Sequence, residues 1–154
     1  MTVDLLAGDP REILLVLALE VEAIRDHGAL DAHLSVPAWV DGDGLDAFAA
    51  AVRDAAGSDG PAPFADACTP FDGPDWAGGR SLARLDPAWL GAVASVADDR
   101  LDAVAARWRR LLEGRPGLPT SPLDEAATRV EAARIVEFAR LAAGSPAVLL
   151  ARAP

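Results

Sequence analysis

The densest run of apolar positions in the chain lies within Pro10 to His27, and it predicts a helix at the centre of the molecule. Every side chain from residue 13 to residue 19 is apolar, so about two turns of this helix have no polar face and are expected to be enclosed on all sides. Asp9 is a suitable N-cap before a proline at the first helical position, and Gly28 suits the C-terminal end. From Glu20 onward one side of the helix turns polar.

Helical spacing of apolar residues recurs four times further along the chain, each time with start and stop signals of its own. The expected helices run from residues 43 to 57, 87 to 97, 100 to 113 and 121 to 143. Short apolar runs at residues 81 to 85 and 147 to 151 predict strands, the second of them buried. Residues 2 to 6 fit either a short edge strand or a lead-in that packs under the central helix. Between residues 30 and 40, Pro37 breaks the pattern, so we expect a short turn of helix and then extended chain.

Residues 57 to 79 form a long stretch rich in glycine and proline. It holds five glycines and four prolines in 23 residues, so no regular element is expected in it. Phe64, Phe71 and Trp76 argue against disorder, because a free linker seldom carries such large apolar side chains. We therefore expect an ordered loop that lies folded against the body of the protein.

Together these patterns predict a single domain over residues 1 to 154 with a mainly α fold. Four to five helices would pack in an orthogonal or bundle-like arrangement around the buried N-terminal helix. A small sheet of two or three strands is the α+β alternative. A chain of 154 residues is long enough to bury a core without a metal ion or a disulfide.

Cysteine usage and hydropathy bear on the compartment. Cys68 is the only thiol in the sequence, which excludes an intramolecular disulfide and fits a reducing compartment. The first residues lack the basic and apolar regions of a secretory signal, and no apolar run approaches the length of a membrane span. We therefore predict a cytoplasmic protein that does not insert into a membrane.

The charges are distributed unevenly along the chain. Residues 1 to 75 hold 15 acidic residues and three arginines, whereas residues 76 to 154 hold nine acidic residues and 11 arginines. The overall net charge is −10, which argues against nonspecific nucleic-acid binding because that requires clustered cations. Lysine, asparagine, glutamine and tyrosine are all absent, a pattern typical of coding bias, so arginine is given little weight as a sign of function.

Catalytic candidates are weak, and the best group surrounds the two histidines. Glu20 and His27 share a helix face, and His33 follows in a less regular segment; carboxylates and imidazoles are common acids, bases and metal ligands. No metal-binding spacing is present, so we predict neither a metal nor a cofactor. The favoured interpretation places His27 in the last helical turn, where the helix dipole favours a cation, with the acids on a solvated face.

Three further motifs have simpler structural explanations. The DGDG sequence at residues 41 to 44 lacks the later ligands of a calcium loop and is better explained as a helix cap. Cys68 has no sequence neighbour that would activate it, so a buried, inert thiol is favoured. Arg107 to Arg110 alternate with Trp108 in the manner of a nucleic-acid patch, but a buried tryptophan flanked by solvated arginines is favoured.

The leading functional hypothesis is a non-catalytic protein-binding module of inhibitor, immunity or accessory type. Its acidic first half would dock a basic protein partner, because charge asymmetry is present and catalytic signatures are not. The residues expected at this surface are Asp41, Asp43, Asp46, Asp54 and Trp76.

The alternative is a small enzyme or ligand-binding protein with an apolar pocket under residues 57 to 79. In that hypothesis His27, His33 and Glu20 would supply acid-base or metal chemistry. A third alternative is a subunit whose exposed apolar surface closes in a homodimer.

Overall fold

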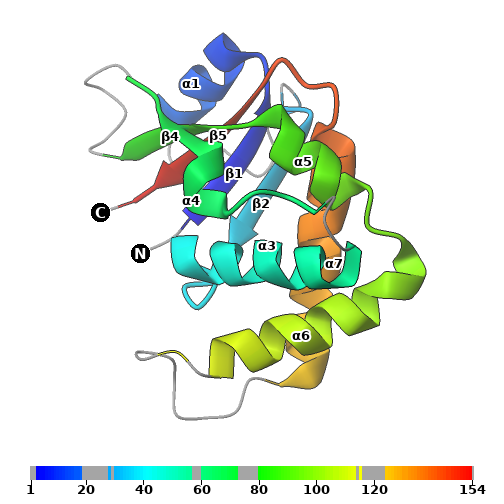
Figure 1. The fold of residues 1–154 in the computed structure, drawn as a ribbon. Helices are drawn as coiled ribbons and strands as arrows, with labels where there is room; N and C mark the ends of the chain where they lie inside the picture. Colours follow the sequence, from blue (N-terminus) through cyan, green and yellow to red (C-terminus); the bar gives the residue numbers. More distant parts are fainter. Residues whose placement is uncertain are drawn as a thin grey trace.

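The chain forms a five-stranded antiparallel sheet with helices on both faces, which is an α+β arrangement (Figure 1). The computed structural model describes residues 3–18, 28, 30–56, 60–72, 80–113, 115 and 124–153. The strands are β1 (Val3–Gly8), β2 (Ala32–Val36), β3 (Cys68–Pro70), β4 (Ser81–Leu85) and β5 (Ala147–Arg152). The helices are α1 (Pro10–Ala18), α3 (Gly42–Ala56), α4 (Phe64–Ala67), α5 (Pro87–Ala94), α6 (Leu101–Glu113) and α7 (Glu125–Ala142), with a short 3₁₀ turn, η2 (Asp98–Arg100), before α6.

The first and last strands of the described chain lie side by side in the middle of the sheet. The strand order is β2-β1-β5-β4-β3, and β1 pairs with β5 from Val3 opposite Arg152 to Gly8 opposite Ala147. Residues 147 to 151 are all buried, because both faces of a central strand are covered in this fold. A strand of this kind has a continuous apolar sequence rather than an alternating one.

Two apolar clusters lie on opposite faces of the sheet. Ile13, Val16 and Leu17 of α1 pack against Leu6 and Leu149 in the smaller cluster. The larger cluster is on the other face and joins side chains of β1, β2 and β5 to α3, α5, α6 and α7. Figure 1 shows α1 on one side of the sheet and these four helices on the other.

Helix α6 lies farthest from the sheet and is attached to it through α3 and α7 (Figure 1). Trp108 is the centre of this attachment and is fully buried. Its ring lies 5.5 Å from that of Trp39 and 5.1 Å from that of Phe48. Its Nε1 donates a hydrogen bond of 2.9 Å to the backbone oxygen of Gly44 at the start of α3. The buried tryptophan predicted within this arginine-rich segment is therefore confirmed.

The predicted mainly α fold is wrong, because the structure contains a five-stranded sheet rather than a helical bundle with two or three accessory strands. The sequence before residue 19 divides into two elements, β1 and α1. Leu5 and Leu6 of β1 face opposite sides of the sheet, and both are fully buried. A short run that is apolar on both faces cannot be distinguished from a buried helix by its period alone.

The N-terminal helix also differs from the expectation of a helix enclosed on all sides. Leu15 is 57% exposed, because α1 covers one face of the sheet and its opposite side meets water. The described helix ends at Ala18. The remainder of the predicted element, residues 19 to 27, lies outside the described residues.

Two segments predicted to be largely irregular contain regular structure. Residues 32 to 36 form β2, with Ala32, Leu34 and Val36 buried at every second position. Residues 64 to 70 form α4 and β3, although their composition predicts no regular element. The pairing of β3 with β4 supplies hydrogen bonds that no local sequence signal encodes.

The predicted start of α5 is confirmed, whereas α7 begins at Glu125 and the start predicted at residue 121 lies outside the described residues. Asp86 accepts a hydrogen bond from the backbone N–H of Ala88 at 2.8 Å, and Asp124 accepts one from Ala126 at 3.1 Å. Gly144 has a φ of +89°, a conformation that favours glycine just beyond the end of α7. Local chemistry therefore fixes these boundaries.

Helix α7 is 18 residues long and amphipathic rather than uniformly apolar. Ile135, Val136 and Phe138 are buried against the larger cluster, whereas Val130 and Leu141 are more than half exposed. Acidic and basic residues alternate along its outer side. Within the described part of the chain, no helix has both the length and the apolar character needed to cross a membrane.

Candidate functional site

The four aspartates predicted to form an acidic docking surface all interact with other parts of the protein. Asp41 accepts a 2.8 Å hydrogen bond from the backbone N–H of Gly44 and therefore caps α3. Asp43 lies 2.6 Å from a guanidinium nitrogen of Arg115. Asp46 accepts a 2.9 Å hydrogen bond from the N–H of Ala65, and Asp54 lies 2.6 Å from Nε of Arg107.

These contacts show what the four carboxylates do within the fold. Arginines from the second half of the chain neutralise Asp43 and Asp54, so the charge asymmetry along the sequence is partly cancelled in space. Exposed ion pairs of this kind are worth about 0–1 kcal/mol each, so a basic partner can compete for them. The DGDG sequence forms a helix cap, as predicted. Trp76, the remaining residue of the predicted surface, lies outside the described residues.

His33 lies beside Asp4, at the edge of the sheet. His33 Nε2 is 3.1 Å from Asp4 Oδ1, and both side chains are about one fifth exposed. His33 also lines a recess of about 130 Å³ between β2 and α7, a volume below that of usual ligand sites. The other two predicted catalytic candidates, Glu20 and His27, lie outside the described residues.

The carboxyl group of Asp4 has a pKa below its ordinary value of 3.8. Burial alone would raise this pKa, but hydrogen bonds with His33 and Ser35, together with the positive charges of His33 and Arg80, outweigh that effect. Ionised Asp4 is therefore stabilised by the fold. This arrangement lacks the order of a catalytic triad, because the carboxylate itself interacts with both the histidine and the serine.

Replacing Asp4 with asparagine is expected to lower the free energy of unfolding by about 1 kcal/mol at neutral pH. Because the folded-state pKa is lowered, the contribution of Asp4 is complete above pH 3.8 and is lost as the pH falls through the folded-state value. Urea unfolding of both proteins at several pH values measures the difference. Asp99→Asn is the control, since Asp99 makes no ion pair with a described residue. A difference that stays constant at low pH would contradict the role assigned to Asp4.

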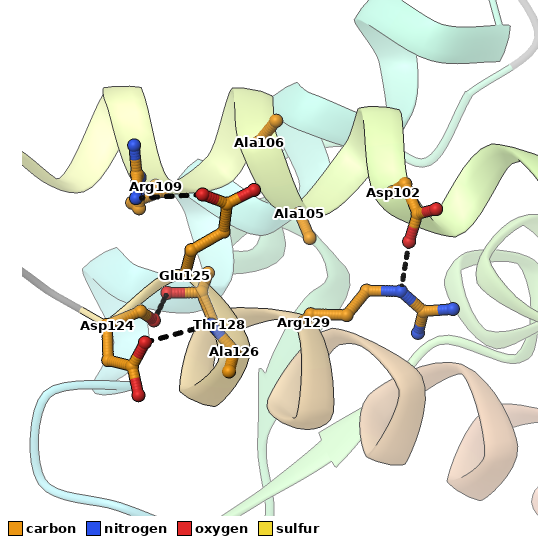
Figure 2. Close-up of a pocket in the computed structure, with 9 residues that line it drawn as sticks. All are labelled: Asp102, Ala105, Ala106, Arg109, Asp124, Glu125, Ala126, Thr128 and Arg129. Atoms are coloured by element: carbon orange, nitrogen blue, oxygen red, sulfur yellow. Dashed lines mark hydrogen bonds and ion pairs between the residues drawn. The ribbon is translucent and has the colours of Figure 1, made fainter.

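A pocket of about 560 Å³ lies between α6 and α7, and we call it the α6/α7 pocket. Figure 2 shows Arg109 and Asp102 of α6 facing Glu125 and Arg129 of α7, with alanine side chains between the two pairs. Arg129 pairs with Asp102, and Arg109 lies 3.7 Å from Glu125. The arginines of this pocket therefore already have carboxylate partners, and an incoming charged ligand would have to displace them.

A second pocket, of about 370 Å³, lies where β3, β4 and β5 meet α4, and we call it the β5 pocket. Its lining is mostly apolar and consists of Ala65, Cys68, Pro70, Ser81, Leu82, Ala83, Leu150 and Arg152. Three of these residues belong to the glycine- and proline-rich stretch. Burial raises the pKa of the Cys68 thiol, although the charge of Arg152 lowers it to a smaller extent, so this side chain is a neutral part of the lining.

Residues 60 to 72, which include three residues that line the β5 pocket, are held to α3 by hydrogen bonds. Arg53 donates a 2.7 Å hydrogen bond to the backbone oxygen of Pro61, and Asp46 accepts the N–H of Ala65. Gly60 lies so close to Arg53 that an added Cβ would be 2.5 Å from its Cα. Residues 60 to 65 of this stretch are therefore hydrogen-bonded to α3.

The two parts of the alternative hypothesis lie apart in the structure. His33 is in register with Leu6, which belongs to the cluster beneath α1. Arg152 is in register with Val3 and Ser81, and Val3 belongs to the cluster on the other face. His33 is therefore not among the residues that line the β5 pocket, and the alternative hypothesis stays a prediction because Glu20 and His27 lie outside the described residues.

No family model, curated protein or solved structure matches the chain. Among the described residues, no three of histidine, cysteine, aspartate and glutamate are grouped so that they could hold a metal ion. The site is therefore interpreted from its own geometry.

Sequence reasoning did not identify Arg152 or Ser81 as site residues. The sequence signal for Arg152 was its position directly after the apolar run at residues 147 to 151.

Proposed function

We propose that this protein binds a small organic molecule in the β5 pocket and does not transform it. The observation that supports this proposal is an apolar recess of about 370 Å³, a volume within the usual range for ligand sites. The recess is built on three strands and covered by a segment that is hydrogen-bonded to α3. Rigid elements of this kind hold a binding site in one shape.

The α6/α7 pocket is larger but less suited to this role. Its arginines are partnered by Asp102, Glu113 and Glu125, so its lining is electrostatically balanced without a ligand. Among the described residues, the lining of the β5 pocket contains one guanidinium and no carboxylate. The proposal includes a cytoplasmic location, which the single thiol of the sequence supports.

Filling the β5 pocket is expected to abolish ligand-induced stabilisation. A thermal-shift screen of small organic acids, alcohols and amines would identify compounds that raise the Tm; ligand at about 100 times its Kd stabilises the fold by about 2.7 kcal/mol. Ala65→Trp places a large ring at the rim of the pocket and is expected to remove the shift.

Ala106→Trp is the matched control, because Ala106 is also an exposed helical alanine that lines a pocket, in this case between α6 and α7. It is expected to leave the shift unchanged. The proposed function is wrong if no compound in the screen raises the Tm of the wild-type protein. It is also wrong if Ala106→Trp, rather than Ala65→Trp, removes the shift.

Docking of a basic protein through Asp41, Asp43, Asp46 and Asp54 stays a prediction. The exposure of the Asp43 side chain, at 76%, supports it. Such a partner would compete with Arg107 and Arg115, and it would break the capping hydrogen bonds if it also took Asp41 and Asp46. Homodimer formation likewise stays a prediction.

A further inference from the structure

Arg152 is placed by the sheet at the base of the β5 pocket. It is the last residue of β5 and lies between Val3 of β1 and Ser81 of β4 in the strand register. Neighbouring side chains in one such row point to the same face of a sheet. The guanidinium therefore lies on the face that carries α3, together with the rest of the pocket.

The Nε atom of Arg152 is buried and has no hydrogen-bond partner among the described residues. Trp89 Nε1 and Glu131 Oε2 share this property, but neither residue lines a pocket described above. The second oxygen of Glu131 is paired with Arg134. Arg152 takes part in none of the ion pairs between described residues. The positive charge of Arg152 therefore has no ion-pair partner among the described residues, and a bound anion in the pocket that this side chain lines would supply one.

Gly42, the first residue of α3, lies next to the guanidinium of Arg152. A Cβ added at Gly42 would lie 2.9 Å from Nη2 of Arg152, so a larger residue here would displace the end of the arginine side chain. The start of α3 therefore limits where the guanidinium can lie.

The other residues that line the β5 pocket indicate which kind of molecule would carry the anionic group. Ala83, Leu150 and Pro70 are apolar, and the Cys68 thiol is neutral. One fixed positive charge faces no carboxylate in this lining, which matches a ligand with a single negative charge. A phosphate dianion carries twice the charge that one guanidinium compensates, and a chain of net charge −10 repels it more strongly than it repels a monoanion.

We infer that the β5 pocket binds a monocarboxylate with a short apolar body, held by a charge-assisted hydrogen bond from Arg152. This inference rests on the proposed function and specifies its ligand class. The carboxylate accepts from the guanidinium of Arg152, and the hydrocarbon lies against Ala83 and Leu150. Gly42 is a positioning residue for this interaction, because it fixes the guanidinium without contacting the ligand.

The test compares carboxylates with alcohols of the same chain length by isothermal titration calorimetry. Butanoate, hexanoate and octanoate are titrated into the wild-type protein beside butanol, hexanol and octanol. The best carboxylate is expected to bind about ten- to a hundredfold more tightly than its alcohol, as a hydrogen bond to a charged group implies. Arg152→Met is expected to remove this preference while the alcohol still binds.

Gly42→Ala tests the positioning role, since the added methyl group must displace the guanidinium. It is expected to weaken carboxylate binding several-fold and to leave alcohol binding unchanged. Arg100→Met, which removes an exposed arginine from η2, is the control for the loss of positive charge. Octyl phosphate tests the second anion class and is expected to bind more weakly than octanoate.

The outcomes separate this inference from the proposed function. Equal binding of carboxylate and alcohol by the wild-type protein overturns the inference and leaves the proposed function in place. Tighter binding of octyl phosphate, or a preference that survives in Arg152→Met, also overturns it. Failure of every carboxylate and alcohol to bind overturns the inference, and the screen described above decides the proposed function separately.

Discussion

Replacing Trp108 with alanine is expected to lower the free energy of unfolding by about 3–5 kcal/mol, the usual cost of removing a large aromatic side chain from a core. Trp108 is fully buried and contacts Trp39 and Phe48, so its loss leaves a cavity between α6 and α3. The hydrogen bond from Nε1 to Gly44 is lost as well. Urea unfolding followed by far-ultraviolet circular dichroism measures the effect without relying on tryptophan fluorescence.

Two companion variants make this result interpretable. Trp108→Phe keeps much of the ring volume and removes the N–H donor, so its cost is expected to be smaller than that of alanine. Trp39→Ala removes a tryptophan that is only partly buried, and it is also expected to cost less. If Trp108→Ala lowers the stability by less than about 1 kcal/mol, α6 is not packed on α3 as described.

A chain that ends after Pro146 is expected not to fold. This truncation removes β5, which pairs with both β1 and β4 and carries the buried residues Val148, Leu149 and Leu150. Their burial contributes about 1.5–3 kcal/mol per side chain. The two remaining strand pairs also lose the hydrogen bonds that join them. Together these losses are comparable with the whole stability of a typical domain, about 5–15 kcal/mol.

Urea titration of the truncated chain is expected to show no cooperative transition. Addition of a peptide with the sequence of residues 147 to 154 is expected to restore the transition, because the peptide can enter between β1 and β4. A peptide of the same composition in scrambled order is the control. A cooperative transition in the truncated chain alone would show that β5 is not the strand on which the sheet depends.

Helix boundaries were predictable from the sequence wherever neighbouring residues determine them. Asp86 caps α5 through a bond to the residue two positions away, and the Asp-Pro pair at residues 86 and 87 shows this pattern in the sequence. Strands β4 and β5 were also found, because short apolar runs mark them. The sheet as a whole was missed, since its order depends on pairing between strands that are far apart in the chain.

In the β2 segment, a helix-breaking proline obscured the alternating pattern of a strand. Ala32, Leu34 and Val36 alternate with His33 and Ser35, which is the period of a strand with one buried face. Because of Pro37, a short turn of helix followed by extended chain was predicted here instead of a strand. The placement of β1 at the centre of the sheet was not predictable, because its apolar residues fit an edge strand or a packed lead-in equally well.

The binding residues were less predictable than the fold. The β5 pocket joins residues 65 to 83 to Leu150 and Arg152, and only strand pairing brings these segments together. Arginine was given little weight as a sign of function because of the coding bias in the composition, so Arg152 was not predicted as a binding residue. The partners of Asp43 and Asp54 are likewise 50 or more residues away in the chain, so sequence reasoning treated those acids as unpaired.

The adjacency of β1 and β5 also bears on how fast the protein acquires its structure. Contacts between residues near opposite ends of a chain form only after a large loop has closed, and proteins rich in such contacts fold in milliseconds to seconds rather than microseconds. The local capping signals allow α5, α6 and α7 to form early. We therefore expect the pairing of residues 3–8 with residues 147–152 to be the slow step in folding.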